Sequence, residues 1–93
     1  MPSVNAERLL ADLRTLRGFG AVADHPRGIV RPSLSPPDMA AREWLRGRFA
    51  EVPTLAKPTI DAVGVVFGRS RNPGPALLMG SHSDSQPTGG WRD

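Results

Sequence analysis

The fold of this chain is decided by two apolar runs, Val63-Gly64-Val65-Val66-Phe67-Gly68 and Ala76-Leu77-Leu78-Met79-Gly80. Between them lies a turn with Asn72-Pro73-Gly74 at its tip. Both runs are nearly continuous in apolar residues, which is typical of strands covered on both faces. Upstream, Lys57-Pro58-Thr59-Ile60-Asp61 suits a short edge strand, because its proline cannot donate a ladder hydrogen bond. We therefore expect two or three strands in the second half of the chain.

Helical spacing dominates the first half of the chain. Ser3 or Asn5 is suited to cap a first helix, and Gly18 is suited to end it. The apolar stripe of this helix consists of four leucines, Leu9, Leu10, Leu13 and Leu16. The segment is therefore predicted to be a packing helix without chemistry of its own. A connector rich in glycine and proline follows over residues 18–35.

A second helix is predicted to begin at Ser35, with Pro36 and Pro37 in its first turn. Asp38, three residues after Ser35, completes an opening that resembles a capping box. Its apolar face comprises five residues, Ala41, Trp44, Leu45, Phe49 and Val52. Pro53 ends the helix. Two helices before two or three strands indicate an α/β layer arrangement instead of a bundle or a barrel.

Composition narrows the class of protein. A length of 93 residues allows one domain at most, and the lack of cysteine excludes disulfides and thiolate metal ligands. The 12 basic residues, all but one of them arginine, are spread along the chain and leave a formal charge of only +3. Nucleic-acid binding is disfavoured, since neither a concentrated basic face nor stacking aromatics are present. No segment approaches the ~20 apolar residues of a membrane span, and no signal-peptide core follows the N-terminus. We expect a cytoplasmic protein.

The residues suited to chemistry gather in residues 80–93. His82 directly follows the second apolar run, and ligands of α/β sheets collect at the carboxyl ends of strands. If the chain stays extended, Asp84 projects on the same side as His82. It can then accept a hydrogen bond from one imidazole nitrogen and leave the other for a metal. The glycine-rich turn over 86–90 can bring Asp93 to the same place, where a carboxylate can bridge two divalent ions ~3.5–4 Å apart.

Other interpretations of these residues stay open. On spacing alone, a histidine two residues before an aspartate is more often a structural hydrogen bond than a metal site. A serine nucleophile is a weak alternative, because Ser81, Ser83 and Ser85 have no second histidine nearby to act as a base. His25, in the connector, is expected to be simply solvated.

A longer motif extends over the end of the chain, Gly80-Ser81-His82-Ser83-Asp84-Ser85-Gln86-Pro87-Thr88-Gly89-Gly90, followed by Asp93. This motif resembles the hydantoinase/carbamoylase family of M20-type metallohydrolases. That family contains N-carbamoyl-L-amino acid hydrolases, β-ureidopropionases and allantoate amidohydrolases. Four further segments extend the resemblance over nearly the whole chain: Gly28-Ile29-Val30-Arg31, Ser35 to Asp38, Ala41 to Leu45, and Asp61 to Gly64 together with Gly68.

The resemblance implies a fold and a set of roles. Residues 1–93 would form the N-terminal part of a zinc-peptidase-like α/β catalytic domain, without the inserted domain that makes the family dimeric. His82 would bind one divalent metal, Zn or Mn, Asp93 would bridge two metals, and Asp84 would orient His82. The implied reaction is hydrolysis of a linear amide or ureido C–N bond in a small molecule, such as an N-carbamoyl amino acid, by metal-activated water.

Two departures from the family pattern stand out. Val65 occupies a position where asparagine is common, and Arg92 one where an aromatic residue usually precedes the aspartate. The paired glutamates and further histidine ligands of the family have no counterpart here, so the chain alone is expected to be inactive. The alternatives are a piece of an M20 aminoacylase or dipeptidase, and a small non-enzymatic interaction module.

Overall fold

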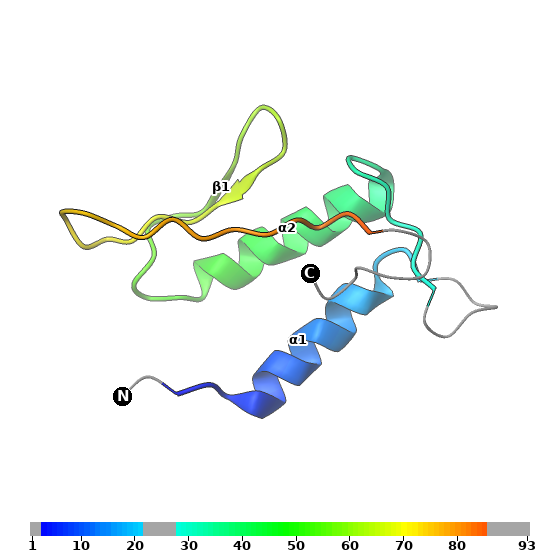
Figure 1. Cartoon of the computed structure of the whole chain (residues 1–93), viewed down its shortest axis with the longest axis horizontal. Coiled ribbons are helices and arrows are strands. Elements are labelled where there is room, and N and C mark those ends of the chain that lie inside the picture. The colour runs from blue at the N-terminus through cyan, green and yellow to red at the C-terminus, as the bar shows by residue number, and fades with distance from the viewer. Residues whose placement is uncertain (1–2, 22–27, 86–93) are drawn as a thin grey trace.

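The computed structural model describes residues 3–21 and 28–85 of the chain. In these ranges the elements are two helices, α1 (Ala6–Gly18) and α2 (Pro36–Ala50), followed by two strands, β1 (Thr59–Ile60) and β2 (Val66–Phe67) (Figure 1). The expected order of two helices and then strands is confirmed, and the number of described strands is two.

Helix α1 begins as the sequence predicts. The Asn5 side chain accepts a hydrogen bond from the Arg8 backbone nitrogen at 3.1 Å, so Asn5 is the cap. The helix ends at Gly18, where the Phe19 nitrogen donates to the Leu16 carbonyl at 3.2 Å. None of its residues is fully buried, so the leucine stripe is only partly covered within the described residues.

Helix α2 also begins at the predicted residue, but the capping box is wrong in detail. Ser35 occupies the N-cap position without a side-chain cap bond, and its hydroxyl instead donates to the Pro32 carbonyl at 2.6 Å. The Asp38 carboxylate accepts from the Leu34 backbone nitrogen at 2.8 Å, one residue before the cap. The reason is that Asp38 is buried and has further partners, so its position is set by tertiary contacts as well as by the helix end.

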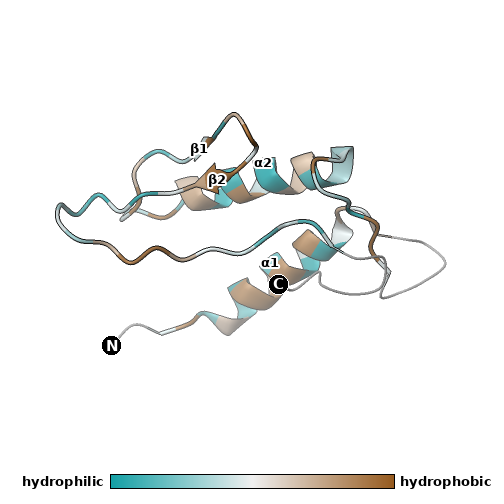
Figure 2. Cartoon of the chain, turned by 45° about the horizontal axis from the view of Figure 1, so that its top comes forward, coloured by the Kyte–Doolittle hydropathy of each residue, from teal (hydrophilic) through white to brown (hydrophobic). Residues whose placement is uncertain are grey.

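The two strands form an antiparallel hairpin against α2 (Figure 2). Thr59 is opposite Phe67 and Ile60 is opposite Val66. The turn between the strands is organised by Asp61, whose carboxylate accepts from the backbone nitrogens of Val63 and Val65 at 3.0 and 2.9 Å. The predicted edge strand near Thr59 is therefore confirmed.

The prediction of a buried strand over Ala76–Gly80 is wrong. The segment is extended, but it forms no strand with any described residue. Leu77, Leu78 and Met79 are 85%, 82% and 81% exposed. The prediction that the first apolar run, residues 63–68, is covered on both faces is wrong as well, since Phe67 is 46% exposed. An apolar run indicates which surroundings a strand prefers, whereas a strand also needs a hydrogen-bonded neighbour, and no described strand is hydrogen-bonded to this segment.

The core of the described residues is small. Its fully buried apolar residues are Ile29 and Ala41, and two charged residues, Arg31 and Asp38, are buried beside them. Helix α1 is joined to α2 by an ion pair of 3.0 Å between Asp12 and Arg48 and by a tilted ring contact between Phe19 and Trp44. Among the described residues, neither helix has the length and apolar character that crossing a membrane requires.

Candidate functional site

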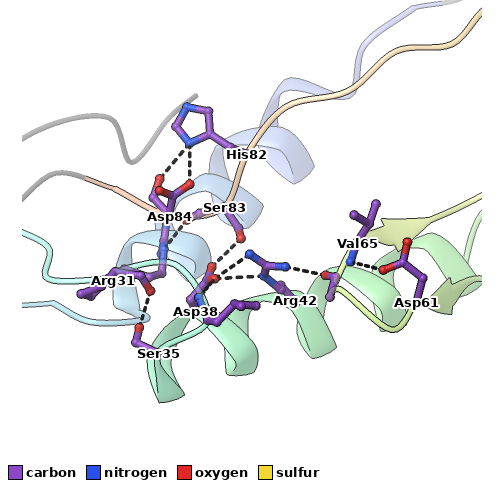
Figure 3. A network of polar contacts seen from close by, with 12 residues as sticks. Arg31, Ser35, Asp38, Arg42, Asp61, Val65, His82, Ser83 and Asp84 are labelled. Atoms are coloured by element: carbon purple, nitrogen blue, oxygen red, sulfur yellow. Dashed lines mark hydrogen bonds and ion pairs between the residues drawn. The ribbon is translucent and has the colours of Figure 1, made fainter.

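The candidate site lies where the extended segment after the hairpin returns along α2 to the start of that helix (Figures 1 and 3). The segment is anchored there by a β-bridge, in which the Ser85 backbone nitrogen donates to the Arg31 carbonyl at 3.0 Å. This bridge joins the residues around His82 to the connector that precedes α2.

His82 and Asp84 lie together, as their spacing predicts. The Nδ1 atom of His82 is 3.2 Å from a carboxylate oxygen of Asp84 and 2.9 Å from the Asp84 backbone carbonyl (Figure 3). Both oxygens are acceptors, so an Nδ1 that hydrogen-bonds to them carries a proton. The two side chains are 54% and 45% exposed, which puts the imidazole at the surface and not in an apolar interior.

Ser83, between them, is held at two points. Its backbone carbonyl accepts a hydrogen bond from the Nε of Arg31 at 2.6 Å. Its hydroxyl donates to the Asp38 carboxylate. Both partners are charged and buried, which makes these hydrogen bonds stronger than neutral ones.

Arg31 connects the site to the end of α1. Its Nη1 donates to the carbonyls of Leu16 and Phe19 at 2.6 and 3.0 Å. A cation is favoured at a helix C-terminus, where carbonyls lack partners within the helix. Burial lowers the pKa of Arg31, and the nearby carboxylates of Asp38 and Asp84 partly oppose this.

Asp38 is the central acceptor of the network. It accepts hydrogen bonds from the Ser83 hydroxyl and the Leu34 nitrogen. It also forms an ion pair with Arg42, whose Nε and Nη2 lie 3.0 and 2.8 Å from the same carboxylate oxygen. Burial alone raises the pKa of Asp38, but the hydrogen bonds from Ser83, Leu34 and Arg42 outweigh it and leave that pKa below its usual value. Arg42 continues to the hairpin turn, where its Nη1 donates to the Gly64 carbonyl at 2.6 Å.

The predicted site residues thus have different outcomes. The structure brings His82 and Asp84 together, whereas Asp93 lies outside the described residues, as does His25. Within residues 3–21 and 28–85, no group of three or more His, Cys, Asp or Glu side chains is arranged to hold a metal ion. A complete metal centre is therefore not formed by the described residues alone.

Sequence reasoning missed the buried network beneath His82, which consists of Arg31, Asp38, Arg42 and Ser83. The spacing of four residues between Asp38 and Arg42 on one helix was an available signal for an ion pair. No local signal marks the contact of Arg31 with Ser83, since 52 positions separate them.

Two known proteins are similar to this chain over nearly its whole length. No protein-family model matches the sequence. The chain is similar to the crystal structure of an amidase of the hydantoinase/carbamoylase family from Burkholderia phymatum, with 57% identity and a TM-score of 0.84 over 98% of this chain and 21% of that one. Over this length, the chain belongs to the hydantoinase/carbamoylase family.

A curated relative supports the same assignment. The chain is 31% identical over 96 aligned positions to the N-carbamoyl-L-amino-acid amidohydrolase of Paenarthrobacter aurescens, a match that covers 100% of this chain. The match covers 22% of that amidohydrolase, so this hydantoinase/carbamoylase segment spans about a fifth of the length of both relatives. The described helices and strands are those of one part of such an amidase.

Proposed function

We propose that this chain is the metal-binding N-terminal part of the catalytic domain of an amidohydrolase that cleaves linear amide or ureido C–N bonds. The substrates would be N-carbamoyl amino acids or related small ureido compounds. The observation that carries the proposal is the pairing of His82 with Asp84 at the end of a segment that shares sequence and fold with carbamoylase-type amidases.

The donor chemistry of the described residues fits one ligand of a divalent cation. Nδ1 of His82 faces two oxygens of Asp84, so Nε2 is the nitrogen that would coordinate the metal. The Asp84 carboxylate would fix the orientation of the imidazole. Asp93, eleven positions after His82, is proposed as the carboxylate that bridges two ions, zinc or manganese.

The chain's own part in the reaction is to hold and orient. Bound zinc or manganese would supply an activated water at neutral pH, because coordination lowers the pKa of water to about 7. His82 would keep one metal at a set distance from the protein, and Asp84 would prevent rotation of the imidazole. By itself the 93-residue chain would bind metal weakly and not turn over substrate, since two ligands cannot fix the geometry of a two-metal centre.

The test transplants this chain into a related enzyme. Residues 1–93 would replace the matched fifth of the Burkholderia phymatum amidase, with which they share 57% identity. We expect the chimera to hydrolyse N-carbamoyl amino acids and to contain metal by elemental analysis. His82→Ala should remove most of the bound metal and the activity, whereas His25→Ala, at the chain's only other histidine, should change neither.

The substrate panel separates the amidase from its relatives. N-acetyl amino acids and dipeptides would be assayed beside N-carbamoyl amino acids, because an aminoacylase or dipeptidase of the M20 type prefers those. A folded chimera whose His82→Ala variant keeps its metal and its activity contradicts the proposal. Efficient hydrolysis by the 93-residue chain alone contradicts its inactivity.

A further inference from the structure

We infer that Arg31 and Asp38 are positioning residues that hold Ser83 from two sides and so set the direction in which His82 and Asp84 point. The inference rests on the proposed role of His82 as a metal ligand. It assigns to the buried network under the site a task beyond holding the two helices together.

The alternation of an extended chain provides the first argument. In such a chain neighbouring side chains point to opposite sides, and every second side chain points to the same side. The Ser83 hydroxyl points inward to Asp38, and the Ser85 hydroxyl is buried too. His82 and Asp84 occupy the alternate positions and are each about half exposed. Holding the serines inward therefore holds the imidazole and the carboxylate outward.

The second argument concerns register. A slip of one residue along an extended segment would exchange its two faces and would turn His82 inward. Two contacts oppose the slip at Ser83, the Arg31 Nε on its carbonyl and the Asp38 carboxylate on its hydroxyl. A third opposes it at Ser85, whose nitrogen donates to the Arg31 carbonyl. Together these contacts specify one register for residues 83–85.

The third argument is that both anchors are themselves fixed. Arg31 is 2% exposed and tied to the C-terminal carbonyls of α1, while Asp38 is 0% exposed and held by Leu34 and Arg42. Arg42 is in turn bound to the Gly64 carbonyl in the hairpin turn. Through these contacts, the direction of His82 is fixed relative to both helices and to the hairpin. Side chains locked in this way are what a precise metal ligand requires.

Two matched serine variants test the inference. Ser83→Ala removes the hydroxyl that donates a hydrogen bond to Asp38. Ser85→Ala removes a buried hydroxyl that has no hydrogen-bond partner among the described residues and keeps the backbone nitrogen of the bridge. Each variant and the parent chain would be examined without metal by nitrogen NMR of the imidazoles, at about pH 8, where model imidazoles are neutral. Zinc alone would then be titrated into each and followed by the same signals.

We expect the parent and Ser85→Ala to hold His82 mainly with the proton on Nδ1, and Ser83→Ala to shift toward a mixture of both tautomers. Zinc affinity at His82 should fall by about 10-fold in Ser83→Ala and stay unchanged in Ser85→Ala, as for other groups that orient metal ligands. Arg31→Lys, which keeps a charge but loses the fork geometry, should resemble Ser83→Ala. Circular dichroism of each variant would establish that it is folded.

The outcomes separate this inference from the proposed function. If Ser83→Ala matches the parent in both tautomer and zinc affinity, the inference is wrong, whatever the parent binds. If the parent binds no zinc at His82 but Ser83→Ala still shifts the tautomer, the positioning stands and the metal role of this chain fails. If the tautomer shifts equally in Ser83→Ala and Ser85→Ala, specific positioning through Asp38 is refuted.

Discussion

Residues 76–80 and residues 83–85 belong to one extended run of chain, yet their surroundings are opposite (Figures 1 and 2). The first group is apolar and exposed, and Leu77 is 85% exposed to solvent. The second is polar and is held against buried charges. Within a few residues the usual relation between polarity and burial is inverted.

The comparison shows that the burial of a residue depends on the packing and hydrogen-bond partners within reach, and not on the polarity of its side chain alone. For Ser83 the partners are present in the described chain, since Arg31 and Asp38 offer a donor and an acceptor at matching positions. For 76–80 the described residues offer neither a neighbouring strand nor an apolar layer. The two relatives are about five times as long as this chain, and their further length is where such partners are to be sought.

The largest effect on stability is expected from removing Asp38, the buried carboxylate to which Ser83 is bound. Asp38→Ala leaves Arg42, whose side chain is 13% exposed, without its carboxylate, and should destabilise the fold by about 3–5 kcal/mol. Glu43→Ala, which breaks the exposed pair with Arg46 on the same helix, should cost at most about 0.5 kcal/mol. Urea unfolding followed by circular dichroism measures both. Equal losses in the two variants would mean that Asp38 is not a structural centre.

A buried and an exposed apolar residue should differ almost as much in their effect on stability. Ile29→Ala removes a side chain that is 0% exposed and should cost about 2–5 kcal/mol. Leu78→Ala removes one that is 82% exposed and should change stability by less than about 0.5 kcal/mol. The same unfolding experiment applies, at chain concentrations where the protein is monomeric by light scattering. A large loss in Leu78→Ala would show that the segment is covered in solution.

Two glycines with positive φ extend the comparison to the backbone. At Gly64 (φ 89°) a Cβ would lie 2.5 Å from the Nη1 of Arg42, which is tied to Asp38 and cannot move without breaking that contact. Gly64→Ala should therefore cost about 2–3 kcal/mol. At Gly74 (φ 99°), in the turn before the exposed segment, a Cβ would meet no atom of the described residues within 4 Å other than its chain neighbours, so Gly74→Ala should cost only the backbone strain of about 1 kcal/mol. Thermal melts that rank the two variants in the reverse order would contradict this account.

The mildest perturbation is acid. The folded pKa of Asp38 is below the unfolded one of about 3.9, so its carboxylate stabilises the fold fully above that pH. The stabilisation is lost as the pH falls through the folded pKa. Unfolding free energies measured between pH 6 and pH 2 should decrease for the parent more steeply than for Asp38→Asn, which has no proton to gain at this position. Parallel curves for the two proteins would exclude Asp38 as the source of the pH dependence of stability.

The parts that sequence predicts well are those set by near neighbours in the chain. Asn5 caps α1 because its side chain reaches a nitrogen three residues on, and α2 begins at Ser35 because prolines suit a first turn. His82 meets Asp84 because extended residues two apart share a side. In each case the interacting atoms are within one turn or one pleat of each other.

The parts that sequence does not predict depend on distant residues. The strand expected at 76–80 fails because a strand is defined by its neighbours, and the described chain contains none for it. The capping role of Asp38 was partly wrong because its second carboxylate oxygen serves Ser83, 45 positions away. The role of Asp93 stays a prediction, as it lies outside the described residues.

The contact between Phe19 and Trp44 gives the site an intrinsic optical reporter. The Trp44 ring lies with its centroid 6.2 Å from that of Phe19, and the Phe19 carbonyl is one of the two that Arg31 binds. The chain has only one other tryptophan, Trp91, so Trp91→Phe leaves a single fluorophore beside the residue that anchors Ser83. Loosening of residues 82–85 can then be followed as a change in emission, without a label and at micromolar protein.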